Sequence, residues 1–186
     1  VNRIDPDKKQ IIFDEDILGY DDLVLALGSE PRQLPEQIGG RLSNVFTIRD
    51  LADVDALAPK FNKGKRVLII GGGYIGLEAA AVAAQRGLSV TLVEVADRIL
   101  KRVAAPQTSE YFRYLHRSRG VAIKEGISLD KLTGNGDVAN VAELSDGTAL
   151  QIDFAIVGVG IFPVTNIAAA AGLSISDGIT VNAFGQ

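Results

Sequence analysis

Gly71, Gly73 and Gly76 stand at the spacing GxGxxG, directly after an apolar run at residues 67–70. In a turn from a strand into a helix, the first such glycine makes the turn tight and the second lets a pyrophosphate approach the main chain, while the third lets the helix pack closely on the strand. The free N–H groups and the positive end of the helix then face the phosphates. The spacing therefore indicates dinucleotide binding, with a glycine-rich turn of another α/β fold as the alternative.

The residues on either side of these glycines favour dinucleotide binding. A buried strand is predicted at 67–70, an alanine-rich helix at 74–86 closed by Gly87, and a second strand at 90–94. These elements form one βαβ unit. Glu94 ends its second strand, where a carboxylate can accept hydrogen bonds from the adenine-ribose hydroxyls. A solvated strand end is the alternative for Glu94.

The nucleotide preference also depends on Glu94. A carboxylate at the end of the second strand repels a 2′-phosphate, so the sequence predicts NADH instead of NADPH as the nucleotide. Arg98 and Arg102 follow closely and would soften that repulsion. We expect Arg102 either to lie along the adenosine or to be a surface charge.

Glu78 is an acid two positions after the last glycine, within an otherwise apolar helical run. A buried carboxylate without a partner is costly, so Glu78 is expected to be turned to solvent or paired. We favour a paired, functional role, because this position faces the cofactor crevice at the start of the helix.

The elements predicted before and after the βαβ unit indicate an α/β fold. A hairpin and a buried strand at 23–27 come first, and Asp50 is a plausible N-cap for a helix at 51–58 that Pro59 stops. After the βαβ unit we expect a helix at 107–119, a strand at 121–123, a β-meander at 127–132, 138–144 and 149–152, a buried strand at 154–157, a helix at 167–171 and a last strand at 179–181. The expected fold class is α/β, with a Rossmann-like doubly wound parallel sheet and an inserted three-stranded β-meander.

Composition excludes several classes of function. Apolar residues make up 47% of the 186 residues and charged residues 23%, which is ordinary globular usage, and the net charge of −4 argues against a duplex nucleic-acid binder. The longest apolar stretch, residues 67–84, contains the glycines and Glu78, whereas a membrane span needs roughly 20 predominantly apolar residues. Cysteine is absent, which removes thiol chemistry and cysteine metal sites from this segment. No signal peptide is visible, so we expect a cytoplasmic protein.

The one basic cluster contains the only histidine. Its members are Arg113, His116, Arg117 and Arg119. Cations are favoured in the last turn of a helix, which is the expected explanation, and a partner-docking patch is the alternative. We expect His116 on the surface and predict no metal site.

The segment before the glycines decides which cofactor they serve. Residues 20–32 resemble the YDxLxxATGxxPR segment of flavoproteins that carry two dinucleotide fingerprints, so Gly71 to Gly76 is the second, pyridine-nucleotide fingerprint. Within the FAD-dependent pyridine nucleotide-disulfide oxidoreductase superfamily, residues 71–78, 102–106 and 158–160 look most like the ferredoxin reductases of bacterial oxygenase systems, of the putidaredoxin reductase type. With Val1 in place of an initiator methionine, we expect a piece of a larger FAD-dependent oxidoreductase.

The resemblance implies a role for each part of the site. Tyr74 and Ile75 would lie between nicotinamide and flavin, and Glu78 would orient the carboxamide and pair with a flavin-domain lysine. Hydride would pass from NADH to FAD and electrons then singly to a ferredoxin-type iron–sulfur protein. Gly158 and Gly160, which follow the strand at 154–157, belong to the same resemblance and would be cofactor-binding residues. Four residues would touch FAD: Ala26, Leu27, Gly28 and Arg32.

The implied domains are a flavin-domain segment at 1–32, an NAD-binding domain at 33–159 and a return into the flavin domain at 160–186. Leu27 replaces the family's usual threonine, Glu30 stands where relatives carry arginine, and Val164 replaces a frequent asparagine. Other functions stay open: a disulfide reductase or NADH oxidase of the same superfamily, or a non-enzymatic NAD-responsive protein of the apoptosis-inducing-factor type.

Overall fold

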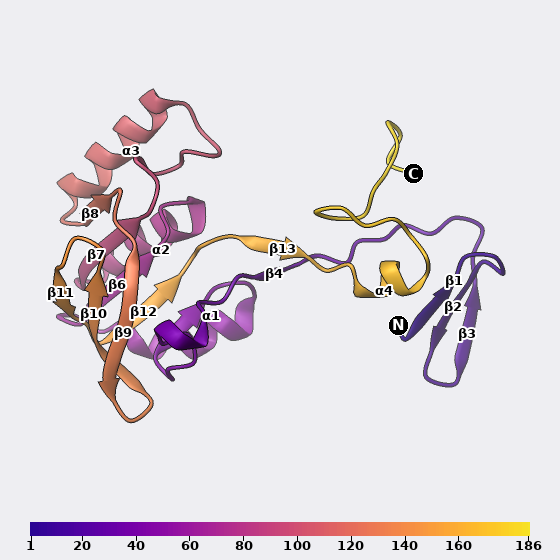
Figure 1. Ribbon diagram of the computed structural model, residues 1–186, viewed down its shortest axis with the longest axis horizontal. Coiled ribbons are helices and arrows are strands. Elements are labelled where there is room, and N and C mark those ends of the chain that lie inside the picture. Colours follow the sequence, from indigo (N-terminus) through magenta and orange to yellow (C-terminus); the bar gives the residue numbers. More distant parts are fainter. The chain divides into compact units, whose positions relative to one another are not determined.

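The computed structural model describes all residues, 1–186, as two compact units (Figure 1). One unit is the continuous stretch Pro31–Gly160, and the other combines Val1–Glu30 with Ile161–Gln186. None of the helices has the length and apolar character that a membrane span requires.

A five-stranded parallel sheet forms the centre of the unit 31–160. Its strands, in spatial order, are β5 (Val45–Thr47), β12 (Phe154–Val157), β6 (Arg66–Ile70), β7 (Ser89–Glu94) and β8 (Ala122–Glu125). All four pairings between neighbours are parallel. The expected α/β class and Rossmann-like sheet are confirmed, as are the strands expected at 67–70, 90–94 and 154–157.

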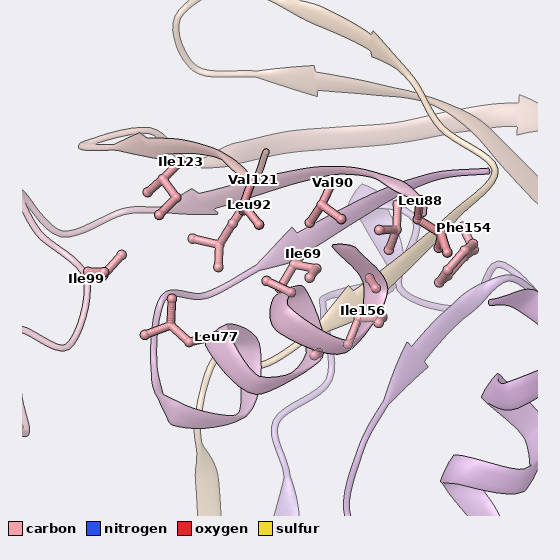
Figure 2. Packing of buried hydrophobic residues seen from close by; sticks show 14 of the residues in the cluster. Ile69, Leu77, Leu88, Val90, Leu92, Ile99, Val121, Ile123, Phe154 and Ile156 are labelled. Carbon is pink, nitrogen blue, oxygen red and sulfur yellow. The ribbon is translucent and has the colours of Figure 1, made fainter. Parts of the chain in front are cut away.

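Both faces of this sheet are buried, which explains why its central strands are continuous apolar runs. On β6, Val67 and Ile69 belong to one core cluster while Leu68 and Ile70 belong to the other. Figure 2 shows the first cluster, in which Leu77 joins the side chains of the strands. Three helices supply this face: α1 (Leu51–Leu57), α2 (Tyr74–Gln85) and α3 (Pro106–Ser118).

The expected β-meander covers the opposite face of the sheet. It consists of β9 (Leu129–Asn135), β10 (Val138–Leu144) and β11 (Ala149–Gln151), paired antiparallel. Leu132, Ala142 and Leu144 of the meander pack with Leu68 and Ile70 of β6. The second layer is therefore a small sheet instead of further helices.

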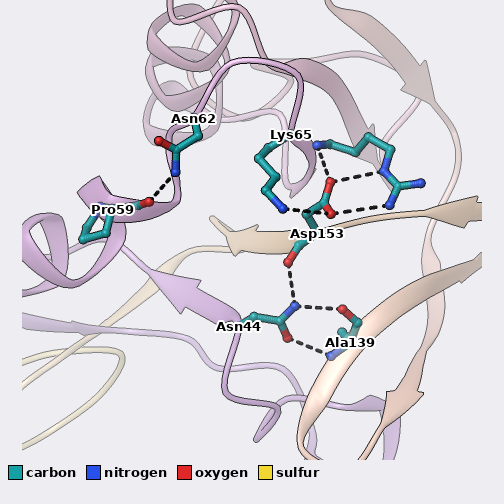
Figure 3. Close-up of polar contacts among 7 residues, drawn as sticks. Asn44, Pro59, Asn62, Lys65, Ala139 and Asp153 are labelled. Atoms are coloured by element: carbon teal, nitrogen blue, oxygen red, sulfur yellow. Dashed lines mark hydrogen bonds and ion pairs between the residues drawn. The ribbon is translucent and has the colours of Figure 1, made fainter.

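One buried amide joins the meander to the parallel sheet (Figure 3). The Asn44 side chain donates to the carbonyl oxygens of Ala139 and Asp153, both at 2.8 Å, and accepts from the Ala139 N–H at 2.8 Å. The carboxylate of Asp153 pairs in turn with Lys65 and Arg66. Asn44 thus satisfies three main-chain groups that would otherwise be buried without partners.

The helix ends follow from identifiable residues. Asp50 caps α1 by accepting from the Asp53 N–H, and the Asp53 side chain accepts from the Asp50 N–H, which makes a capping box. Gly87 ends α2 with φ of 78°, donating to Ala84 while Leu88 donates to Ala83. The short 3-10 turns Glu36–Ile38 (η1) and Ala58–Lys60 (η2) complete the helical segments.

The unit formed by residues 1–30 and 161–186 is smaller. It contains an antiparallel sheet of β1 (Arg3–Asp5), β2 (Gln10–Phe13) and β3 (Asp16–Gly19), and the short helix α4 (Asn166–Ala170), which lies against β1. A further pair of strands is formed by β4 (Ser29–Pro31) and β13 (Ile161–Pro163).

Three expectations were wrong. Residues 23–27 form no strand, because no neighbouring strand pairs with them, and the Val24 side chain is 87% exposed. Residues 179–181 also form no strand, since only the isolated bridge between Ile175 and Ile179 is made. His116 is not a surface residue but is 7% exposed, and its ring nitrogens lie 2.9 Å from the Phe112 oxygen and 3.0 Å from the Leu77 oxygen.

Candidate functional site

Gly71 and Gly158, two of the sequence-predicted glycines, lie at the carboxyl ends of β6 and β12. After β6 the chain passes through the glycine turn and α2 to β7. In the sheet, β7 and β12 lie on opposite sides of β6. Gly158 follows β12 and donates to the Ile70 oxygen at 2.7 Å. Crevices of this kind, at a point where strand order changes direction, bind ligands in open α/β sheets.

The first and third glycines are required by close main-chain approaches. A Cβ on Gly71 would lie 2.3 Å from the Gly158 oxygen, and Gly71 has φ of 108°. A Cβ on Gly76 would lie 2.0 Å from the Gly71 oxygen. Both positions therefore exclude any side chain, which accounts for the tight turn and the close packing of α2.

Gly73 differs from the other two because a Cβ there would meet nothing within 4 Å. It is the N-cap of α2, and no side chain caps the helix. The first N–H groups of an α-helix have no partners within the helix, so this open space borders unused donors at the positive end of α2. A pyrophosphate fits this arrangement.

Glu94 lies beside the glycine turn and holds it. Its Oε2 accepts from the Gly72 N–H at 2.6 Å, and its Oε1 accepts from the Ala96 N–H at 2.7 Å. A Cβ on Gly72 would lie 3.1 Å from the Glu94 Cβ. Gly72 is thus a site residue that the spacing GxGxxG does not single out. Each carboxylate oxygen keeps a free lone pair, so Glu94 can still accept from a ribose.

The two arginines after Glu94 have different surroundings. The Arg98 guanidinium donates to the Ser109 Oγ at 2.6 Å and to the Lys101 oxygen at 3.2 Å. Arg102 is exposed and makes no hydrogen bond or ion pair within the chain. Arg102 is therefore the arginine available to a nucleotide.

Glu78 is exposed on α2 and has no hydrogen bond or ion pair within the chain. It lines an apolar groove of about 330 Å³ together with Ile75, Val82 and residues of α1. The expected pairing of Glu78 therefore has no partner among these 186 residues. Tyr74 and Ile75 precede it with 57% and 41% of their surfaces exposed, so they are accessible to a ligand.

The expected flavin contacts are divided between the two units. Arg32 donates its N–H to the Gly160 oxygen at 2.9 Å, and Gly160 has φ of 112°. Ala26, Leu27 and Gly28 belong to the smaller unit, where Gly28 accepts from the Val164 N–H at 3.1 Å.

The sequence profile of the pyridine nucleotide-disulphide oxidoreductase family matches residues 1–186. The chain belongs to this family. Putidaredoxin reductase of Pseudomonas putida is a relative of 40% identity, with the match covering 98% of this chain and 44% of that protein. A ferredoxin–NAD(P)+ reductase of Sphingomonas sp. is 41% identical, over 100% of this chain and 45% of the relative. The chain therefore spans less than half the length of these oxidoreductases.

Solved structures of the family agree with the fold. A ferredoxin reductase from Rhodopseudomonas palustris superposes with a TM-score of 0.89 at 37% identity, covering 96% of this chain and 44% of that one. The reductase of a covalent putidaredoxin reductase–putidaredoxin complex gives a TM-score of 0.86 at 37% identity, covering 95% of this chain and 43% of that one. The superfamily and the ferredoxin-reductase resemblance expected from the sequence are confirmed.

Proposed function

We propose that the chain is the NADH-binding part of an FAD-dependent ferredoxin reductase, with NADH and a ferredoxin-type iron–sulfur protein as partners. The observation that carries this proposal is the open space at Gly73, bordered by the start of α2 and by Glu94. Relatives named as ferredoxin reductases at about 40% identity support the choice of electron acceptor. Similarity to bacterial reductases supports the further proposal that the protein is cytoplasmic.

The preference for NADH over NADPH rests on charge. Glu94 remains available to accept from the adenine-ribose hydroxyls, and the same carboxylate repels a 2′-phosphate. Arg98 donates to the neutral Ser109 and Lys101 oxygens and keeps its charge, so both Arg98 and Arg102 offset part of that repulsion. Arg102 has no partner within the chain and is free to lie along the adenosine.

At the other end of the nucleotide, we assign Tyr74, Ile75 and Glu78 to the nicotinamide. Tyr74 and Ile75 provide exposed apolar surface at the start of α2, where a ring can stack. Glu78 lies one turn further along α2, and its carboxylate is free to accept from the carboxamide. These three residues position the nicotinamide, and the transfer needs no side-chain acid or base.

The family's second cofactor, FAD, is assigned mainly to residues near the start of the chain. The main chain of residues 23–27 makes no hydrogen bond within the chain, so its polar groups are available to a bound group. We assign Ala26, Leu27, Gly28 and Arg32 to FAD, and Gly158 and Gly160 to cofactor binding. A bound FAD would supply the acceptor for the hydride of NADH and the one-electron donor for the iron–sulfur protein. We accordingly assign 33–159 to the NAD-binding domain and 1–32 with 160–186 to the flavin-binding domain.

Two measurements test the proposal. The purified chain is titrated with NADH and NADPH, and saturable binding with tighter affinity for NADH is expected. The longer protein is then assayed for NADH-dependent reduction of a [2Fe–2S] ferredoxin. An absence of nucleotide binding would contradict the site, whereas binding without ferredoxin reduction would contradict only the acceptor.

A further inference from the structure

The loop of residues 95–105, between β7 and α3, is held in place from three directions. The Leu100 N–H donates to the Gly72 oxygen in the glycine turn at 2.9 Å. The Ile99 N–H donates to the Glu125 Oε1 of β8 at 2.9 Å, and the Ile99 oxygen accepts from the Ser109 Oγ of α3 at 2.6 Å. Both main-chain polar groups of Ile99 are thus bound by side chains from other elements.

The geometry of this loop requires such support. Leu100 has φ of 54°, a left-handed conformation that is unfavourable for a leucine. The Ile99 side chain is fully buried, and its Cγ2 would lie 2.7 Å from a Cβ on Gly72. A shift of the loop would therefore be transmitted directly to the glycine turn.

Glu125 is in turn fixed by a two-point ion pair. Arg113 donates through Nε to Oε2 at 2.7 Å and through Nη2 to Oε1 at 2.9 Å. Burial is the largest single influence and raises the pKa of Glu125, but hydrogen bonds from Arg113 and Ile99, with the charges of Arg113 and Arg117, together outweigh it and the pKa lies below its ordinary value. The pKa of Arg113 is raised, chiefly by its hydrogen bond to Glu125. The pair therefore favours the ionised form of both groups.

We propose that Glu125, Arg113 and Ser109 are positioning residues of the dinucleotide site. None of them needs to touch the ligand. They hold the 95–105 loop, which carries Arg102, against the glycine turn, and so preform the wall beside the adenosine. The inference rests on the proposed function, because it assigns the loop to the adenosine half of NADH.

Disrupting these contacts should lower the fraction of molecules in which the site is formed, and the apparent affinity for NADH should fall with that fraction. If the loop is correctly placed in about one molecule in ten without the ion pair, the apparent Kd for NADH rises about tenfold. The same factor applies to ADP-ribose, because the loop faces only the adenosine half.

The experiment compares Glu125→Gln and Ser109→Ala with Asp146→Asn in the 186-residue chain. Asp146 is a matched control, since it pairs at 2.8 Å with Lys124, the residue before Glu125 on β8, but contacts no residue of the loop. Each variant is titrated with NADH and with ADP-ribose well below its midpoint of thermal unfolding, which is measured separately. Glu125→Gln and Ser109→Ala should bind both ligands about tenfold more weakly, and Asp146→Asn should bind like wild type.

The outcomes are distinct. Equal affinities for wild type, Glu125→Gln and Ser109→Ala would overturn the positioning role, even if the variants unfold at lower temperature. Equal losses in all three variants, Asp146→Asn included, would also overturn it, because they would show general loosening. Failure of the wild-type chain to bind NADH or ADP-ribose would instead overturn the proposed function.

Discussion

Glu94→Ala is expected to change the ratio between the affinities for NADH and NADPH, more than either affinity alone. Both Glu94 oxygens hold main-chain N–H groups, of Gly72 and Ala96. Alanine removes these bonds and loosens the turn for either nucleotide. The ratio of the two affinities cancels this shared loss and isolates the contribution of the 2′ position.

The magnitude follows from charge. A 2′-phosphate about 4 Å from the Glu94 carboxylate is repelled by roughly 4 kcal/mol at an effective dielectric constant near 20. The exposed Arg102 offsets part of this. A net preference of about 3 kcal/mol equals roughly a hundredfold or more in favour of NADH. Glu94→Ala should remove most of that factor.

The assay is a set of four titrations, NADH and NADPH with wild type and Glu94→Ala, at one ionic strength. Glu143→Ala is the control, because Glu143 is an exposed carboxylate on β10 with no side-chain partner, and its removal changes the net charge equally. A ratio that stays unchanged in Glu94→Ala, or a wild type that prefers NADPH, would refute the assignment of Glu94 to the adenine ribose.

Three further predictions test other parts of the site. Gly73→Ala should lower the unfolding midpoint only slightly, because its Cβ meets no atom of the chain and only the N-cap preference for glycine over alanine is lost, yet it should weaken NADH binding. Gly76→Ala should prevent folding, because its Cβ would lie 2.0 Å from a main-chain oxygen. Circular dichroism and NADH titration distinguish the two variants. Glu78→Ala in the longer protein should slow flavin reduction at saturating NADH by on the order of a hundredfold with little change in NADH affinity, since a misplaced nicotinamide reacts slowly; an unchanged stopped-flow rate would make Glu78 a structural acid. Because the pKa of Glu125 is lowered in the folded state, its stabilisation should be complete above the ordinary carboxyl pKa of roughly 4.3 and be lost as pH falls through the folded value. The difference in unfolding free energy between wild type and Glu125→Gln should therefore shrink in acid, and a pH-independent difference would contradict this sign.

Local patterns were sufficient to predict the elements that carry the site. The glycine spacing, the apolar run of β6 and the acid at position 94 lie within a single βαβ unit, so turn geometry and periodicity specify them. The structure places Glu94 beside Gly72, and the role of Glu94 toward a nucleotide stays a prediction. The strand β5 (Val45–Thr47) was missed, because three residues give no periodic signal.

The errors share a physical cause, which is that they concern neighbours distant in sequence. Residues 23–27 have the composition of a strand, but a strand exists only beside another strand, and none pairs with them here. His116 lies in an arginine-rich segment, yet its position on α3 directs its ring toward the Leu77 oxygen of α2. The composition of a segment does not show which distant residues it will contact, and both wrong predictions depended on such contacts.

The same reasoning explains why the support of the site is harder to predict than the site itself. Gly71 must be glycine because of Gly158, which lies far along the chain, and Ile99 is fixed by Glu125 on a strand that follows the whole of α3. These contacts exist only once the parallel register of β12, β6, β7 and β8 is established. A βαβ fingerprint therefore identifies the groups that face the nucleotide, while the affinity they achieve depends on contacts set by the order of the strands in the sheet.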